Sequence, residues 1–221
     1  MLPFFEFPQR LPGGFHFPAR MTVLPLADRA IALVSPIPID EGLAAKVAAL
    51  GDVKALIAPN LLHHKYLAEA IAFWSKASVL APGALRKKRP DLRIDHPLED
   101  GLPAEFDGAV RALKIDGAPK IDEFVFFHER TRTAVVSDLV FNITKPQGIV
   151  ANVVLPIVGC DGVLAQSRAW RFFAKDRAAA AASARALIAM RPDALVVAHG
   201  DVVESGASDK LKKALAWMCA A

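Results

Sequence analysis

The stretch RMTVLPLADRAIALVSPIPID, residues 20–40, carries the signals that decide the fold class. Its two halves, RMTVLPL and RAIALVSPI, are rich in β-branched and apolar residues, which is typical of buried strands. The ADR between them predicts a tight turn. Asp40 then stands where a helix N-cap belongs, because residues 41–50 repeat apolar side chains with helical spacing. The stretch therefore predicts two strands followed by a helix.

Downstream of this stretch, strands and helices alternate. VKALIAPN (53–60) and SVLAPG (78–83) are read as short buried strands, with a helix between them over 65–76. DEFVFFHERTRTAVVSDLVFN (122–142) predicts a hairpin, and DALVVAHGD (193–201) predicts a last buried strand. The other helices are predicted over three later segments: 166–174, 177–190 and 208–218. This order predicts a layered α/β protein with helices on the outer faces of its sheets.

Three segments give weaker signals. Residues 1–14 form a Pro/Phe-rich opening to which we assign no strand, and residues 84–120 are rich in loops. Residues 145–165 contain several prolines and glycines and have no clear assignment. No repeat or low-complexity linker divides the chain, so we expect a single domain over residues 1–221.

Composition narrows the possible partners. The net charge of +4 favours anionic partners only mildly. No apolar run approaches the ~20 residues of a membrane-spanning helix, and the N-terminus lacks the apolar stretch of a signal peptide. We therefore expect a cytoplasmic protein that does not bind membranes. The basic run RKKR (86–89) is read as a solvated loop rather than a nucleic-acid interface, because no aromatic residues interleave with it.

Four ionisable side chains lie where predicted strands end. His63 and His64 follow ALIAP, Asp138 follows TAVVS, and His199 follows ALVVA. Ligand and catalytic residues favour such positions, because a rigid sheet fixes the backbone just before a variable loop. Imidazole nitrogen and carboxylate oxygen are ligands that zinc, iron and manganese accept. Each residue alone is also explained by a buried hydrogen bond, a turn or surface polarity.

The chain resembles the metallo-β-lactamase superfamily, from about residue 18 to about residue 205. The resemblance lies in RMTVLPLADRAIALVSPIPID, VKALIAPNLLHH, AVVSDLVFN and LVVAHGD. It implies a four-layer αββα sandwich with a metal site at one edge of the sheets. It also implies hydrolysis of ester, thioester, amide or phosphodiester bonds by one or two metal ions and a bound water.

The leading metal-binding motif of that family, H-x-H-x-D-H, is degenerate here. When His64 takes its last position, Pro59 and Leu61 take the first two histidine positions and His63 takes that of the aspartate. A further histidine of the family has no counterpart near DGAPK (116–120). The resemblance therefore implies that the first metal position is lost.

The second metal position can be rebuilt, since Asp138 matches the family's bridging aspartate and His199 its final histidine. We expect one divalent ion held by His63, His64, Asp138 and His199, with zinc the first choice and iron or manganese as alternatives. Asp138 is the expected catalytic residue of a hydrolase acting on an ester-, lactone- or phosphate-type bond. Four ligands leave tetrahedral zinc no open position unless one stands aside, and His63 is the expected one. The alternatives are a closed structural site, or a non-catalytic binding protein that has lost its metal.

Five further residues are candidates for the surroundings of the site. Asp201 is placed to orient a ligand histidine, and Asn142 to line the pocket. Arg168 and Arg171 are candidates for clamping an anionic group of a small-molecule substrate. His96 is a candidate for a further ligand or for a contact to one.

Overall fold

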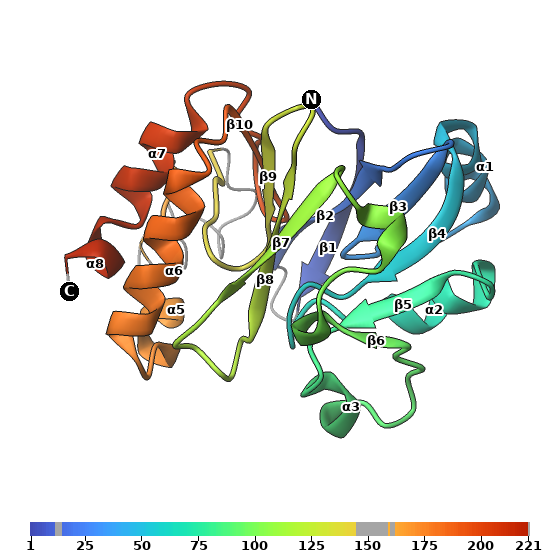
Figure 1. Ribbon diagram of the computed structural model, residues 1–221, viewed down its shortest axis with the longest axis horizontal. Coiled ribbons are helices and arrows are strands. Elements are labelled where there is room, and N and C mark those ends of the chain that lie inside the picture. The colour runs from blue at the N-terminus through green and yellow to red at the C-terminus, as the bar shows by residue number, and fades with distance from the viewer. Residues whose placement is uncertain (12–14, 145–158, 160–161, 221) are drawn as a thin grey trace.

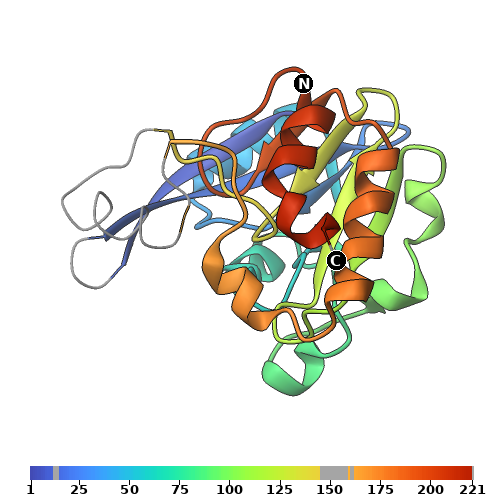
Figure 2. The same cartoon turned by 90° about the vertical axis from the view of Figure 1, so that its left-hand side faces the viewer.

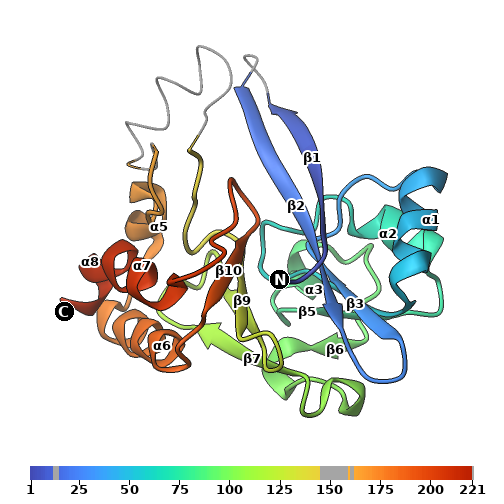
Figure 3. The ribbon, with the colours of Figure 1, turned by 90° about the horizontal axis from the view of Figure 1, so that it is seen from above.

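The computed structural model describes residues 1–11, 15–144, 159 and 162–220. Two β-sheets face each other at its centre, with helices on both outer sides (Figure 1). Helices α1 (Glu41–Leu50) and α2 (Leu67–Phe73) cover one sheet, and α6 (Arg177–Ala189) and α7 (Ala207–Ala214) cover the other. The view from above shows the layers in the order helix, sheet, sheet, helix (Figure 3). The predicted αββα sandwich is confirmed.

Each interface between layers has its own apolar core. Val47 of α1 and Leu67 of α2 are buried against the first sheet, and Leu187 of α6 is buried against the second. Phe126 and Ile57 belong to the cluster between the two sheets. Full burial of such a side chain contributes roughly 1.5–3 kcal/mol, so these cores fix the sheets that carry the site.

The first sheet has six strands in sequence order. Its first three strands pair antiparallel with their neighbours, and each pair of neighbouring strands from the third to the sixth is parallel. The strands are β1 (Phe4–Leu11), β2 (Phe15–Pro25), β3 (Ala30–Val34), β4 (Asp52–Ile57), β5 (Ser78–Ala81) and β6 (His96–Pro97). The parallel strands end at one edge, from which the loops toward the site depart.

The second sheet has four strands in the order β10-β9-β8-β7. Strands β8 and β9 form the predicted hairpin, and β10 runs parallel to β9. The strands are β7 (Val110–Ile115), β8 (Glu123–His128), β9 (Thr133–Val136) and β10 (Ala194–Val197). Because β9 and β10 are parallel, their carboxyl ends lie at the same edge of the sheet.

Helix boundaries follow the predicted caps. The Asp40 carboxylate accepts a hydrogen bond of 2.7 Å from the Leu43 N–H and begins α1, and Gly51 follows the helix. Asp176 caps α6 in the same way. The shorter helices are α3 (Leu85–Lys88), α5 (Arg168–Phe173) and α8 (Ala216–Cys219), with 3₁₀ turns η2 (Leu98–Asp100) and η3 (Ala104–Phe106). In the part of the chain that the structure describes, no helix has the length and apolar character needed to cross a membrane.

The opening of the chain differs from the prediction. Residues assigned no strand form β1, which pairs with β2 in a long hairpin that projects from the body (Figure 2). Pro8 lies in β1 opposite Pro18. A proline on an edge strand removes no donor that the sheet needs, so its presence did not exclude a strand. Most of the segment 145–165, which has no assignment from the sequence, lies outside the described part of the chain: residues 145–158 and 160–161.

The hairpin also ties the two sheets together. The guanidinium of Arg20, on β2, is buried and donates hydrogen bonds to the Val197 carbonyl oxygen of β10 and to the Glu6 carboxylate of β1. Arg20 also lies over the Phe4 ring, 4.5 Å from its centroid. This contact holds β2 beside the end of β10, where the site begins.

Candidate metal centre

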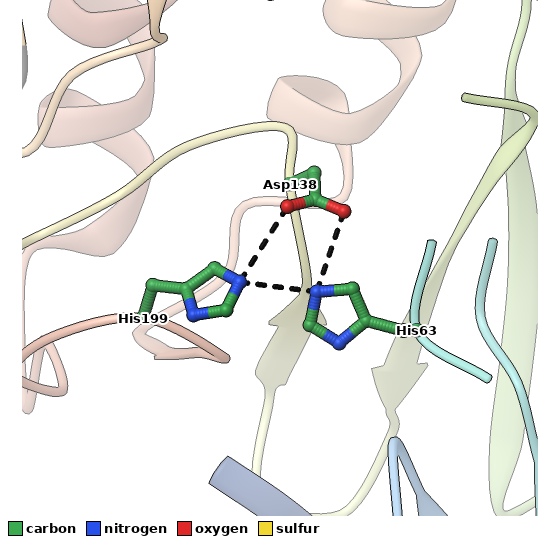
Figure 4. A group of neighbouring side chains, drawn as sticks. All are labelled: His63, Asp138 and His199. Carbon is green, nitrogen blue, oxygen red and sulfur yellow. Dashed lines mark hydrogen bonds and ion pairs between the residues drawn. The ribbon is translucent and has the colours of Figure 1, made fainter. Parts of the chain in front are cut away.

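Three predicted ligands converge at the facing edges of the two sheets (Figure 4). The Nε2 atoms of His63 and His199 are 3.0 Å apart. Asp138 Oδ2 lies 3.3 Å from His63 Nε2, and Asp138 Oδ1 lies 3.5 Å from His199 Nε2. One donor atom from each residue lies within 4.8 Å of the others, which is close enough for one ion to contact all three.

Parallel pairing explains why two of these residues meet. Val136 at the end of β9 is paired with Val197 at the end of β10. Asp138 and His199 each follow their paired valine by two residues, so both leave the sheet at the same level. His63 comes from the loop after β4, in the facing sheet.

The remaining nitrogens of the two imidazoles have other partners. His199 Nδ1 lies 2.7 Å from the Pro18 carbonyl oxygen of β2. A carbonyl oxygen can only accept, so this nitrogen carries the proton and Nε2 of the neutral ring presents a lone pair. His63 Nδ1 lies 2.5 Å from the Ser35 hydroxyl oxygen. Ser35 directly follows β3 with φ +59°, a left-handed conformation that is uncommon for a residue other than glycine.

Asn60 joins Asp138 to the loop that carries His63. Its amide nitrogen donates a 2.7 Å hydrogen bond to Asp138 Oδ2. Its amide oxygen accepts from the backbone N–H groups of Leu62 and His63, both at 2.8 Å. Asn60 is fully buried, so one side chain fixes both the carboxylate and the backbone of the neighbouring ligand.

The Glu123 side chain binds the backbone of Asp138 and of the residue before it. This residue begins β8 and is 1% exposed, and its carboxylate accepts hydrogen bonds from the N–H groups of Ser137 and Asp138 at 2.8 and 3.1 Å. Burial, and then the nearby charge of Asp138, raise the pKa of Glu123 to about 8. The loop that presents Asp138 is therefore tied to a side chain of the adjacent strand.

The electrostatics of the three ligands are strongly coupled. Burial alone raises the pKa of Asp138, but the charge of His63 and the proximity of both imidazoles outweigh it and hold the pKa well below its usual range. Burial lowers the pKa of His63, but the charge and hydrogen bond of Asp138 reverse this and leave the pKa raised. Burial, with the charge of His63 acting in the same direction, lowers the pKa of His199. The site thus holds an ionised carboxylate beside a neutral imidazole.

A cavity of about 230 Å³ opens onto these ligands. Its walls come from the β1–β2 hairpin, from the segment after β3 and from the loop before α2. The residues that line it are Gln9, Ala19, Ser35, Pro36, Ile37, Leu62, His63, Lys65, Tyr66, Asp138 and His199. A small molecule in this cavity would contact the ligands directly.

His64, also predicted as a ligand, lies outside the group formed by His63, Asp138 and His199. Its Nδ1 lies 3.0 Å from a guanidinium nitrogen of Arg89, and Arg89 also pairs with Asp91. Burial, and the charges of Lys88 and Arg89, lower the pKa of His64. His63, which was expected to stand aside, is the histidine that faces Asp138.

The motif therefore lies one residue earlier than the sequence suggested. When His63 takes the last position of H-x-H-x-D-H, Ala58 and Asn60 fall on the first two histidines and Leu62 falls on the aspartate. Asn60 then occupies a ligand position of the family while it donates to Asp138. In this alignment too, histidine is absent from the first two motif positions, so the motif still implies that the first metal position is lost.

The basic run 86–89 is exposed or half-buried as expected, but it belongs to a short helix rather than to a loop. Residues 85–88 form α3, and the Lys88 ammonium donates to the Leu61 carbonyl oxygen at 2.6 Å. Arg86 donates to the Ile94 carbonyl oxygen at 2.9 Å, and Arg89 contacts His64 as described. Lys88 and Arg89 therefore connect this helix to the loop that carries His63.

Hydrogen bonds of Asn142 join the segment after β9 to residues 199 and 201, which follow β10. The Asn142 amide donates to the Asp201 carbonyl oxygen at 2.7 Å, and its backbone N–H donates to the His199 carbonyl oxygen at 3.0 Å. The Asp201 carboxylate accepts from the Thr144 hydroxyl. The His199 imidazole is oriented by the Pro18 carbonyl, so the role expected of the Asp201 carboxylate falls to the backbone of β2.

The remaining predicted residues lie elsewhere on the described chain. Arg168 is an exposed residue of α5, and the Arg171 guanidinium lies over the Trp217 ring, 5.4 Å from its centroid. His96 is exposed and pairs with Leu80 in the β5–β6 ladder. None of these three lines the described walls of the cavity.

Comparison with known proteins supports the architecture. The sequence matches no protein-family model and no curated protein. Its structure is similar to that of a metallo-β-lactamase from Erythrobacter litoralis, with a TM-score of 0.65, 14% identity, and coverage of 97% of this chain and 91% of that one. These values show that the chain has the metallo-β-lactamase fold.

Two other solved structures show how widely this fold is used. The DIM-1 metallo-β-lactamase gives a TM-score of 0.60 at 12% identity, over 97% of this chain and 92% of that one. The flavodiiron core of Flv1 from Synechocystis gives 0.64 at 14% identity, over 98% of this chain and 58% of that one. Hydrolytic and diiron proteins thus share the architecture, and the site has to identify the chemistry.

Proposed function

We propose that this protein is a metal-dependent hydrolase that uses one divalent ion held by His63, Asp138 and His199. The supporting observation is the convergence of two imidazole Nε2 atoms and a carboxylate within 4.8 Å, while both Nδ1 atoms are engaged elsewhere. Zinc is the first candidate, and iron and manganese accept the same donors.

The donor set fits a cation for an electrostatic reason. The lone pair of His199 Nε2 faces the carboxylate of Asp138 and the His63 ring, so electron-rich atoms crowd together. A divalent ion stabilises this arrangement, and two neutral imidazoles with one carboxylate leave a net local charge near +1. Apart from the metal, a proton on His63 is the other cation that this group can hold.

Three protein ligands also suit catalysis better than four. A structural zinc site is closed by four protein ligands, whereas a catalytic site has three and keeps one position for water or substrate. His64 contacts Arg89 instead of the ligand group, and the cavity opens onto His63, Asp138 and His199, so a water or substrate molecule could reach an ion held there. When bound, the ion would lower the pKa of a water molecule or polarise an ester, lactone or phosphate group.

The residues of the chain prepare this site by fixing its ligands. Asp138 is the central ligand and the proposed catalytic residue, and Asn60 and Glu123 hold its carboxylate and backbone. Ser35 and the Pro18 carbonyl fix the orientation of the two imidazoles. Such contacts around a metal site typically change affinity or activity by about 10–100-fold when removed.

A specific observation favours a second candidate, a non-catalytic binding protein without metal. Ala58, Asn60 and Leu62 stand where the family motif has ligands, and Asn60 already satisfies Asp138 by hydrogen bonding. In this case the same cavity binds a small molecule without turnover.

Metal analysis of protein purified without chelator separates the two candidates. The proposal expects about one equivalent of metal per chain, lost in His63→Ala and His199→Ala but retained in His64→Ala. It also expects metal-dependent turnover of at least one ester, lactone or phosphodiester in a panel of small substrates. Protein that is free of metal, takes up none on addition, and turns over nothing supports the binding protein instead.

A further inference from the structure

We infer that the cavity takes a small, mostly apolar molecule with a single carboxylate, and that Lys65 binds the carboxylate. This inference rests on the proposed function for the reaction, but not for binding itself. It concerns the wall of the cavity that contains Lys65, a residue not predicted to bind substrate; the predicted clamp of Arg168 and Arg171 is missing from the described walls.

The size of the cavity limits the ligand. Its volume of about 230 Å³ lies below the ~300–1,000 Å³ typical of pockets for drug-sized ligands. The β1–β2 hairpin closes one side through Gln9 and Ala19. A short acyl chain fits this space, whereas a polymer would have to extend beyond it.

The walls are mainly apolar. Pro36 and Ile37 form the side next to β3, and the ring of Tyr66 is held by an edge-on contact with Phe7 at 5.9 Å between centroids. Leu62 also lines the cavity and is 49% exposed. Binding of an apolar group would cover Leu62 and remove this surface from water.

The charges of the residues that line the cavity favour a negatively charged polar group on the bound molecule. Lys65 is the cationic side chain among the described lining residues, apart from the two histidines. Its ammonium lies 4.9 Å from the centroid of the Tyr66 ring, which keeps it at the wall. Among the described lining residues Asp138 is the one acidic residue, and it is engaged by Asn60 and the histidines. An anionic group in the cavity therefore meets Lys65 and no exposed carboxylate of the described lining.

Binding of hexanoate and hexanamide tests the inference, because the two probes have similar shapes and differ in charge. Calorimetric titration is performed on chelator-treated protein, so the result does not depend on a metal. We expect hexanoate to bind about 3–10-fold more tightly than hexanamide. Lys65→Met should abolish this preference, and Lys65→Arg should retain it. Lys46→Met, an exposed lysine on α1, changes the net charge equally and should leave both affinities unchanged.

The apolar wall has its own control. Leu62→Ser should weaken both probes by the same factor, since it removes apolar contact and leaves the charge. Equal affinity for the two probes in the unmodified protein, or an unchanged preference in Lys65→Met, overturns the inference. Failure of zinc uptake in a parallel titration would count against the proposed function alone, because the probe measurements contain no metal.

Discussion

Replacing each of two adjacent histidines gives a direct test of the site. His63 Nε2 faces Asp138 and His199, whereas His64 Nδ1 faces Arg89. Structural zinc sites in finger peptides bind with about 10–16 kcal/mol, or about 2.5–4 kcal/mol for each of four ligands. At 1.4 kcal/mol per tenfold change, loss of one ligand weakens binding by about 10²–10³-fold. We expect this loss in His63→Ala and a change of less than about threefold in His64→Ala.

Competition with a chromophoric zinc chelator measures both affinities on the same scale. Circular dichroism and thermal unfolding of the metal-free variants show whether either substitution disturbs the fold. His64→Ala is the matched control, because it removes the same chemical group from the adjacent position of the same loop. Equal losses in the two variants, or no loss in His63→Ala, would refute the assignment of the ligand.

Three other perturbations test the contacts around the site and the stability of the chain. Ser35→Ala should weaken zinc binding by about 10–100-fold, because His63 Nδ1 loses its partner; unchanged affinity in the chelator competition would contradict this. Glu123→Ala should lower the free energy of unfolding by at least about 2 kcal/mol, because N–H groups including that of Asp138 lose a buried acceptor, and a urea midpoint equal to that of the unmodified protein would count against it. Burial alone raises the pKa of Glu99, but hydrogen bonds from backbone N–H groups and the charge of Lys114 outweigh burial and leave this pKa lowered. Its ionised form therefore stabilises the fold above the unfolded pKa of about 4.3 and ceases to do so as pH falls, so Glu99→Gln should flatten the acid limb of stability against pH, and parallel limbs would argue otherwise.

The layered fold was predictable because its signals are local. The segment 20–40 contains β-branched runs, a turn and a cap, and each acts within a few residues of itself. Asp40 caps α1 as expected, and the hairpin of β8 and β9 has the predicted arms. These features determine the order of strands and helices, and the order largely determines the layers.

Strand β1 was not predictable in the same way. Its residues include Pro8, which disfavours a strand when the sequence is read alone. Whether proline is tolerated depends on whether the strand lies at an edge, and that is a property of the assembled sheet. Phe4 pairs with Thr22 and Pro8 pairs with Pro18, so β1 forms as a strand by pairing with β2.

The sequence could indicate that ionisable side chains at strand ends lie together, but not which of His63 and His64 faces Asp138. Strand ends are visible in the sequence, and parallel pairing of β9 with β10 then brings Asp138 beside His199. The loop after β4 has no regular period, so its residue pattern does not show which imidazole turns inward. That choice depends on Asn60, which binds the loop backbone and Asp138 together, and on Arg89, which lies 25 residues beyond His64.

This dependence gives the degenerate motif a physical meaning. Alignment by residue type favours His64, because it is the last histidine of the pair. The contacts favour His63, because the buried amide of Asn60 fixes its backbone N–H and the carboxylate of Asp138 at once. Asn60, at a position where the similar family has a ligand, therefore positions two of the three proposed ligands here. If Asn60 has this role, Asn60→Ala should reduce zinc affinity although Asn60 itself touches no metal, and Asn60→Asp should not restore it, since a second carboxylate would repel Asp138.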